Sequence, residues 1–264
     1  MKQRKGETQM TYSYLGGGDL PDVDISMPEG QLTAGNAIGI LVMNDSYPYL
    51  PGDVVNASTY NFPVHYKILE EITVERILKA DSTLIDSVIR GAQELQKQGV
   101  RAIVGACGYF ANYQEKTAAA LDIPVYISSL LQAPIIKKGL KPDQKVGIMC
   151  ANAGGLTPSL LSQCGLSDLT DVVIAGAQDL PEFKNIIEST GHFNSYKVQQ
   201  ELVGLAKQFV SSNPNIGAIL LECSAFPPFA YAIQNAVKLP VFDFSTLINW
   251  VFSAVVRRPF TGFI

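Results

Sequence analysis

The stretches RAIVGACGYF (residues 101–110) and GAILLECSAF (residues 217–226) resemble each other and decide the fold. Each is a short apolar run that ends at a cysteine, Cys107 or Cys223, with small or polar residues and a helical sequence after it. A short apolar run bounded by turn residues is typical of a buried parallel strand. We therefore expect each cysteine where a strand meets the start of a helix, which is the edge of an open α/β sheet where ligands bind.

The similarity extends further back in each half of the chain. The segment AIGILVMN (residues 37–44) aligns without a gap with KVGIMCAN (residues 145–152). Each half then contains a strand with glycine at its third position, a second strand, a helix and a strand that leads to cysteine. We interpret this order as a diverged duplication that brings two thiols to one cleft. Chance alignment of apolar strands is the alternative, because few residues are identical.

Composition narrows the class of protein. The 264 residues are 47% hydrophobic and 17% charged, which fits parallel strands covered on both faces in one large domain or two small ones. The net charge of −4 does not indicate the basic surface that a nucleic-acid-binding protein usually has. No apolar run is long enough to span a bilayer, and the polar N-terminus has no apolar signal core. We therefore expect a cytoplasmic protein that binds neither nucleic acid nor membrane.

The other reactive residues indicate no metal and no cofactor. The four cysteines form no C-x-x-C pair, and the two histidines, His65 and His192, are far apart in the sequence. No G-x-S-x-G nucleophile motif is present. We predict that Cys150, within a strand, and Cys164, late in a short helix, serve packing alone.

The remaining segments alternate between strands and helices. Residues 1–36 are polar and glycine-rich and predict an N-terminal arm or tail. The long segment of residues 44–63 is typical of a lid or a binding loop. Further strands are expected within residues 67–74, 125–127, 172–175 and 241–244. Further helices are expected from Asp81 or Ser82 to Gly99, over residues 111–121, 198–210 and 247–256, and after Pro158 and Pro228.

Two thiols at matching strand ends suggest an acid and a base on opposite faces of a substrate carbon. The α-proton of a carboxylate is very weakly acidic, so the site must stabilise an enolate-like charge. Backbone N–H groups after each cysteine are suited to this task and to lowering the thiol pKa. The candidate substrate-binding residues are Asn44, Gly108, Tyr109, Ser128, Asn152 and Ser224. For Glu222, beside Cys223, two interpretations stay open: a group that orients the thiol or accepts a proton, and a surface carboxylate.

The motifs Gly105-Ala-Cys107-Gly and Leu220-Leu-Glu-Cys223-Ser, with the two Gly-x-x-x-x-Asn strands, resemble the aspartate/glutamate racemase superfamily. This superfamily includes hydantoin racemases, arylmalonate decarboxylase and maleate isomerase, and the chain looks closest to an uncharacterised racemase-like branch. The resemblance covers residues 37–264. It implies two pseudo-symmetric three-layer α/β domains with parallel sheets, one of residues 37–135 plus 242–264 and one of residues 136–241, and an active site in the cleft between them.

The same resemblance implies that Cys107 and Cys223 are the catalytic thiols. It implies that Asn44 contacts the substrate, and that Gly108, Tyr109 and Ser224 bind its carboxylate. The chain departs from glutamate racemases, which commonly have Cys-Asn-Thr and Cys-Thr-His where this chain has Cys-Gly-Tyr and Cys-Ser-Ala. The histidine that assists the second thiol is therefore missing, which puts glutamate in doubt as the substrate.

Together these features predict a cofactor-independent isomerase, a racemase or epimerase of an amino acid or related carboxylate. One alternative is a cis–trans isomerase or decarboxylase of a dicarboxylate that uses a single cysteine. Another is a non-catalytic carboxylate-binding protein. The expected partner is a small-molecule carboxylate. A homodimer is suggested by the family and by the apolar C-terminal helix, although that helix would equally pack inside one chain.

Overall fold

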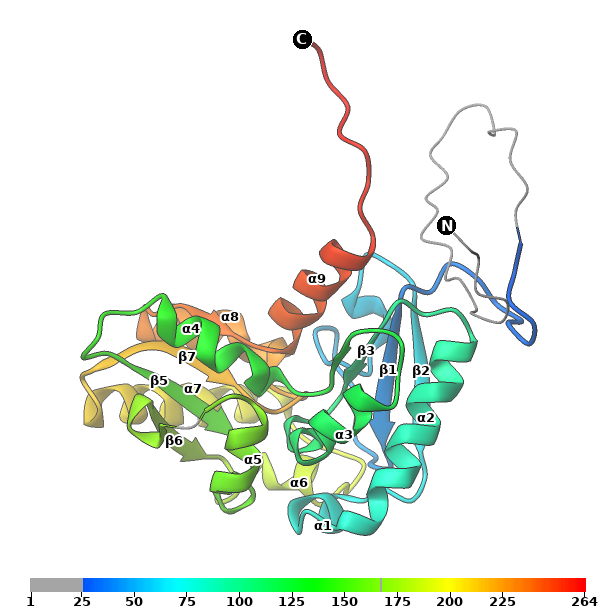
Figure 1. Cartoon of the computed structure of the whole chain (residues 1–264). Helices are drawn as coiled ribbons and strands as arrows, with labels where there is room; N and C mark the ends of the chain where they lie inside the picture. The colour runs from blue at the N-terminus through cyan, green and yellow to red at the C-terminus, as the bar shows by residue number, and fades with distance from the viewer. Residues whose placement is uncertain (1–25, 167) are drawn as a thin grey trace.

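The computed structural model describes residues 26–166 and 168–264, which form two four-stranded parallel sheets (Figure 1). The first sheet has the strand order β2-β1-β3-β4 and the second has the order β6-β5-β7-β8. The strands of the first sheet are β1 (Ile38–Met43), β2 (Val64–Leu69), β3 (Ala102–Gly105) and β4 (Val125–Tyr126). Those of the second are β5 (Lys145–Cys150), β6 (Val172–Gly176), β7 (Ile216–Leu221) and β8 (Val241–Phe242).

The two sheets repeat one topology. The first strand of each half, β1 or β5, occupies the second position, with later strands on either side in parallel register. Both strands carry glycine where a neighbouring element packs closely. A β-carbon at Gly39 would lie 3.1 Å from Leu95, and one at Gly147 would lie 3.0 Å from Phe209. The predicted α/β fold of two pseudo-symmetric halves is confirmed.

Helices follow the strands in both halves. The α-helices are α1 (Val74–Leu78), α2 (Ile85–Lys97), α3 (Gln114–Ala119), α4 (Ala133–Lys138), α5 (Pro158–Gln163), α6 (Lys184–Ile187), α7 (Ser195–Ser212), α8 (Ala230–Val237) and α9 (Phe244–Val255). Short 3-10 helices are η1 (Ala57–Thr59), η2 (Ser82–Leu84), η3 (Gly108–Tyr113), η4 (Ser129–Gln132), η5 (Ala153–Gly155), η6 (Leu169–Asp171) and η7 (Pro227–Phe229). Two of these, η3 and η7, follow the cysteine-bearing strand ends.

Side-chain caps fix several helix starts. Thr157 accepts a hydrogen bond from the Leu160 amide ahead of Pro158, as the sequence predicts for α5. Asp243 accepts from the Thr246 amide at 2.9 Å and forms a capping box at the start of α9. The apolar side chains of α9 then pack in one cluster with β1 and β3. The C-terminal helix therefore covers the first sheet, although β8 just before it belongs to the second.

Three hydrophobic clusters form the core. One joins the two halves and runs from Leu41 and Ile103 of the first sheet to Ile148 and Leu220 of the second. A second lies under α7 and α8, and the third lies between the first sheet and α9. Because apolar contacts continue from sheet to sheet, the two halves bury a shared surface that lies beside their strand ends.

Two sequence predictions differ from the structure. The second strand occupies Val64–Leu69 rather than residues 67–74, because the Ile72 amide closes a turn onto Leu69 and Thr73 caps α1. The helix expected over residues 111–121 begins earlier, as η3. Most of the predicted N-terminal arm, residues 1–25, lies outside the described residues. The domain limits stay a prediction.

Candidate active site

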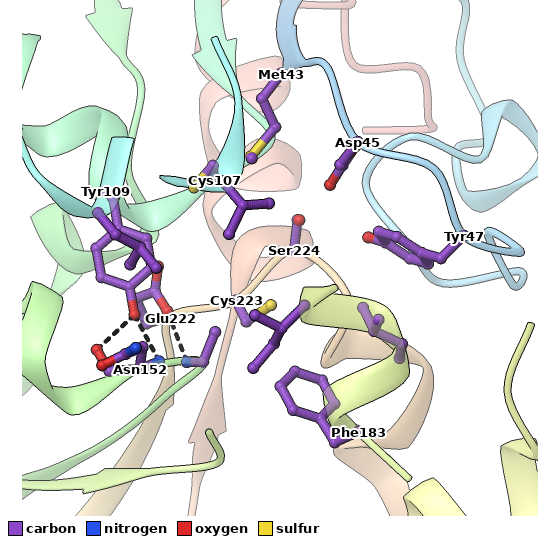
Figure 2. A pocket seen from close by; sticks show the side chains of 15 residues that line it. Met43, Asp45, Tyr47, Cys107, Tyr109, Asn152, Phe183, Glu222, Cys223 and Ser224 are labelled. Carbon is purple, nitrogen blue, oxygen red and sulfur yellow. Dashed lines mark hydrogen bonds between the residues drawn. The ribbon is translucent and has the colours of Figure 1, made fainter. Parts of the chain in front are cut away.

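A pocket with a cavity volume of about 50 Å³ lies where both cysteine-bearing strand ends meet (Figure 2). Its size suits a small ligand, since one water needs roughly 10–15 Å³ measured in this way. Residues from both halves line it: Met43, Asp45, Tyr47, Val74, Leu78, Cys107, Tyr109, Ala151, Asn152, Phe183, Ile186, Ile187, Glu222, Cys223 and Ser224. The structure therefore brings both predicted thiols to one cavity.

Cys107 stands at the N-cap position of η3, two residues after β3. Burial is the main cause that raises the pKa of its thiol, and the nearby Glu222 carboxylate raises that pKa further. The backbone N–H groups of Tyr109 and Phe110 act in the opposite direction, because they favour the thiolate. Cys107 is thus a buried thiol with two amide donors on the side of η3.

Cys223 lies just past the end of β7 and is half-buried. Burial and then Glu222 raise the pKa of its thiol, while the Ala225 amide lowers it. Both cysteines line the same pocket, and a negative charge on Cys107 would raise the pKa of Cys223 further. Both thiols therefore favour the protonated state, and a ligand that favours the thiolate must change that balance.

Glu222 is a fully buried carboxyl group between the two halves, so the surface-carboxylate interpretation is wrong. Its Oε2 accepts a hydrogen bond from the Ala151 amide at 3.1 Å. Burial raises the pKa of Glu222 to about 7, against the opposing effect of the Ala151 and Gly108 amides. A β-carbon at Gly108 would overlap this carboxyl group, so the absence of a side chain at Gly108 lets Glu222 reach its position.

Tyr109 connects the two halves beside the pocket. Its hydroxyl donates to the Asn152 carbonyl and accepts from the Asn152 amide, both at 2.7 Å. The Asn152 side chain accepts from the Gly154 amide at 2.9 Å, so its orientation is fixed. Because the Tyr109 hydroxyl is engaged by backbone, the Asn152 side-chain N–H₂ group is the better donor to a ligand.

The predicted binding residues divide into two groups. Tyr109, Asn152 and Ser224 line the pocket, whereas Asn44, Gly108 and Ser128 do not. Asn44 is exposed, and its side-chain amide donates to the Glu70 carbonyl at 3.0 Å. The buried Ser128 hydroxyl donates to the Gly108 carbonyl at 2.7 Å, so it supports the Cys107 turn from behind.

Sequence reasoning missed several lining residues, among them Met43, Asp45, Tyr47 and Phe183. Asp45 and Tyr47 belong to the long segment after β1, for which the sequence predicted a binding role without naming these residues. Tyr47 is held by a 3.0 Å hydrogen bond from its hydroxyl to Asp53. Phe183 comes from the chain just before α6 and is fully buried. The two remaining cysteines, Cys150 and Cys164, lie in the core.

Comparison with known proteins identifies relatives that are named as lyases. The chain is 30% identical over 233 residues to dimethylsulfoniopropionate lyase of Durusdinium sp. clade D, covering 86% of this chain and 77% of that protein. It is also 30% identical over 238 residues to dimethylsulfoniopropionate lyase 3 of Emiliania huxleyi, covering 86% of this chain. The chain spans 61% of the length of that second relative. No protein-family model matches the chain.

Solved structures confirm the fold. The chain superposes on a glutamate racemase from Bacillus anthracis with a TM-score of 0.55 at 16% identity, covering 83% of this chain and 82% of that one. The fold is therefore that of the aspartate/glutamate racemase superfamily, as the two cysteine motifs indicated. At such low identity the likeness establishes the architecture and leaves the reaction to other evidence.

The predicted enzyme class is wrong. We expected an isomerase, but the relatives with 30% identity carry the name of a lyase. The physical reason is that a thiol base can serve an isomerisation or an elimination, so two thiols in one pocket do not reveal which of these reactions follows. No helix of the described ranges is long and apolar enough to cross a membrane. The cytoplasmic location and the homodimer stay predictions.

Proposed function

Since the chain belongs to the dimethylsulfoniopropionate lyase family, we propose that it is a lyase that eliminates a sulfide from a small sulfonium carboxylate. The observation that supports this function is the pocket in which both halves place a cysteine at the end of an equivalent strand. Dimethylsulfoniopropionate carries a carboxylate at one end, a dimethylsulfonium group at the other, and two CH₂ groups between them. Its α-proton is the one that a base must remove.

In the proposed reaction Cys107, as a thiolate, takes the α-proton. The electron pair of that C–H bond forms the double bond between the α- and β-carbons, and the β-carbon–sulfur bond breaks. The sulfonium sulfur keeps the bonding pair and leaves as neutral dimethyl sulfide, with acrylate as the second product. The thiol then loses its proton to solvent. The sulfide needs no proton to leave, so the elimination requires one base and no general acid.

We assign the role of base to Cys107 because more backbone amides stabilise its thiolate than stabilise that of Cys223. The Tyr109 and Phe110 amides both lower its pKa, whereas Cys223 has one such donor, from Ala225. Amides at a helix start stabilise a thiolate by their hydrogen bonds and dipoles. Cys223 then lies across the pocket as a group that positions the substrate (Figure 2).

The proposed carboxylate donors are the Asn152 side-chain amide and the Ser224 hydroxyl. Ser224 forms no side-chain hydrogen bond to any described residue, and Figure 2 shows its hydroxyl directed into the pocket. Hydrogen bonds to the carboxylate become stronger as enolate-like charge develops during proton removal, so such donors favour the transition state. Asn44, Gly108 and Ser128 do not line the pocket, so we assign them no direct contact with the substrate.

The test is incubation of the native protein with dimethylsulfoniopropionate, with sulfide measured by gas chromatography and acrylate by NMR. We expect both products in equal amounts.

The variant Cys107→Ser should lower kcat by about 100-fold or more, the range for loss of a general base. Cys164→Ala, which changes a cysteine buried away from the pocket, should retain activity within about twofold. Absence of sulfide release, or full activity in Cys107→Ser, would contradict the proposal.

A further inference from the structure

The pocket has an unusual charge for a site that receives a carboxylate. Among the described residues, its lining includes two carboxyl groups, Asp45 and Glu222, and no lysine, arginine or histidine. A dianionic ligand would meet only negative or neutral side chains there, which is unfavourable in a site of low dielectric constant. A zwitterion is different, because its positive end is attracted by a carboxylate of the pocket while its negative end binds elsewhere.

Asp45 is placed to meet such a positive end. Its carboxylate is half-buried and directed into the pocket from the segment after β1 (Figure 2). The Tyr49 hydroxyl donates to both Oδ1 at 3.1 Å and the Asp45 carbonyl at 3.0 Å, which fixes the residue. Within residues 26–166 and 168–264, no cationic side chain forms an ion pair with Asp45. The Tyr49 hydroxyl and a backbone amide favour its ionised form, so a fixed carboxylate without a cationic partner lines the pocket.

An aromatic ring, that of Tyr47, lies next to Asp45 in the pocket wall (Figure 2). Tyr47 is buried, and its ring packs 4.6 Å from that of Tyr49, while Asp53 holds its hydroxyl. Phe183 lies below them in Figure 2 and packs 5.1 Å from Phe226. Aromatic faces attract methylated cations such as quaternary ammonium groups, and they provide apolar contact for the methyl groups. Of the two proposed carboxylate donors, Asn152 lies on the far side of the pocket beside Tyr109, and Ser224 lies between Asp45 and Cys223 (Figure 2).

We infer that Asp45, together with the Tyr47 ring, forms a subsite for the cationic dimethylsulfonium end of the substrate, and this inference rests on the proposed lyase function for the identity of that cation. The subsite gives the enzyme its preference for zwitterionic onium carboxylates over dicarboxylates and over neutral isosteres. The Asp45 charge opposes ionisation of Cys107, and a bound cation compensates that charge.

A matched pair of non-reacting ligands tests the subsite by binding alone. N,N-dimethyl-β-alanine has a dimethylammonium group where the substrate has dimethylsulfonium, and 4-methylpentanoate has an uncharged CH group at that position. Isothermal titration calorimetry at about pH 8 keeps the amine protonated, since alkylammonium groups ionise near pH 10. We expect the native protein to bind the cation at least about tenfold more tightly than its neutral isostere.

Asp45→Asn should reduce that preference to about twofold or less, while the affinity for 4-methylpentanoate stays within about twofold of the native value. The control is Asp168→Asn, which makes the same charge change at a surface residue that caps η6. It should leave the preference unchanged. Equal affinity of the native protein for both ligands, failure to bind either one, or an unchanged preference in Asp45→Asn would overturn the inference.

Binding and turnover separate the two proposals. A cation preference that depends on Asp45, without release of dimethyl sulfide, would refute the lyase function and keep the subsite. Sulfide release without a cation preference would refute the subsite and keep the lyase function. Comparison of the two ligands on the native protein needs no variant, so the result does not depend on whether Asp45→Asn folds.

Discussion

The Tyr109 hydroxyl joins the Cys107 turn of the first half to the chain after β5 of the second half, through paired 2.7 Å hydrogen bonds to the Asn152 carbonyl and amide. Removing that hydroxyl in Tyr109→Phe leaves two backbone groups without their partner. Each buried polar group without a partner costs about 1–3 kcal/mol. Because water can reach the half-buried Asn152, we expect a total loss of about 1–3 kcal/mol in the free energy of unfolding, measured by urea denaturation.

Activity should distinguish this contact from an ordinary buried hydrogen bond. Tyr113→Phe is the matched control, since the Tyr113 hydroxyl donates to the Asp81 carbonyl at 2.9 Å within the first half. Both variants lose stability, but only Tyr109→Phe is expected to raise KM and lower kcat, because it frees the pocket wall that carries Asn152. Equal kinetic effects in the two variants would show that Tyr109 has no positioning role.

Gly108→Ala should destabilise the protein through Glu222. The added methyl group meets the Glu222 carboxyl at less than van der Waals distance, and overpacking of a tight interior costs about 1–3 kcal/mol. Glu222→Ala in the same chain should remove most of that penalty, because it deletes the atoms that clash. The measurement is a double-mutant cycle on the free energy of unfolding.

The control for this cycle is Gly204→Ala in α7. A β-carbon at Gly204 meets no atom, so alanine there should stabilise the helix by about 0.5–1 kcal/mol. If the penalties of Gly108→Ala and Glu222→Ala were additive, the close approach of the two residues would have no energetic consequence.

The repeated strands made the fold predictable. Apolar runs with glycine at matching positions identify β1 and β5, and the two cysteines mark the ends of β3 and β7. Strand ends in a parallel sheet share one edge, so proximity of Cys107 and Cys223 to one cleft followed from the pattern. The second strand was placed too late, within residues 67–74, because apolar Ile72 and Val74 follow after the ladder has ended at Leu69.

The rest of the site required the structure because loop side chains have no fixed period. We expected Asn44 in the pocket, but extended chain alternates its side chains between opposite sides. Met43 and Asp45 therefore face the cavity, and Asn44 faces Glu70. Phe183 is far from both cysteines in the sequence, and no local motif connects it to them. Glu222 was recognised as a candidate, while its burial depends on the missing side chain at Gly108.

Glu222 should make the stability of the protein depend on pH. Its pKa is about 7 in the folded protein and near 4.5 in the unfolded chain, so the folded state favours the protonated carboxyl. The stabilisation is therefore complete below about pH 4.5 and lost as the pH rises through 7. Relative to Glu222→Gln, the native protein should lose roughly 3 kcal/mol of unfolding free energy across this window.

Urea denaturation of both proteins at several pH values measures this difference. Asp45 and Asp53 also have raised pKa values, of about 6 and about 7, and they are present in both proteins, so their contributions cancel in the comparison. A difference between native and Glu222→Gln that stays constant over the window would refute the buried, elevated pKa of Glu222.

The Glu222 charge should also control the reactivity of both thiols. Its carboxylate raises the pKa of Cys107 and of Cys223, after the larger effect of burial, because a nearby negative charge disfavours a thiolate. Glu222→Gln removes this repulsion and keeps the size of the side chain. At a pH above the Glu222 pKa of about 7, we expect both cysteines to react with iodoacetamide faster, by about tenfold if the thiol pKa falls by about one unit. Peptide mass spectrometry assigns the rate to each cysteine, and Asp168→Asn, with the same charge change at the surface, should leave both rates unchanged. Unaltered rates in Glu222→Gln would mean that the Glu222 charge has no effect on the thiol pKa, since the thiolate would then gain nothing from the loss of that charge.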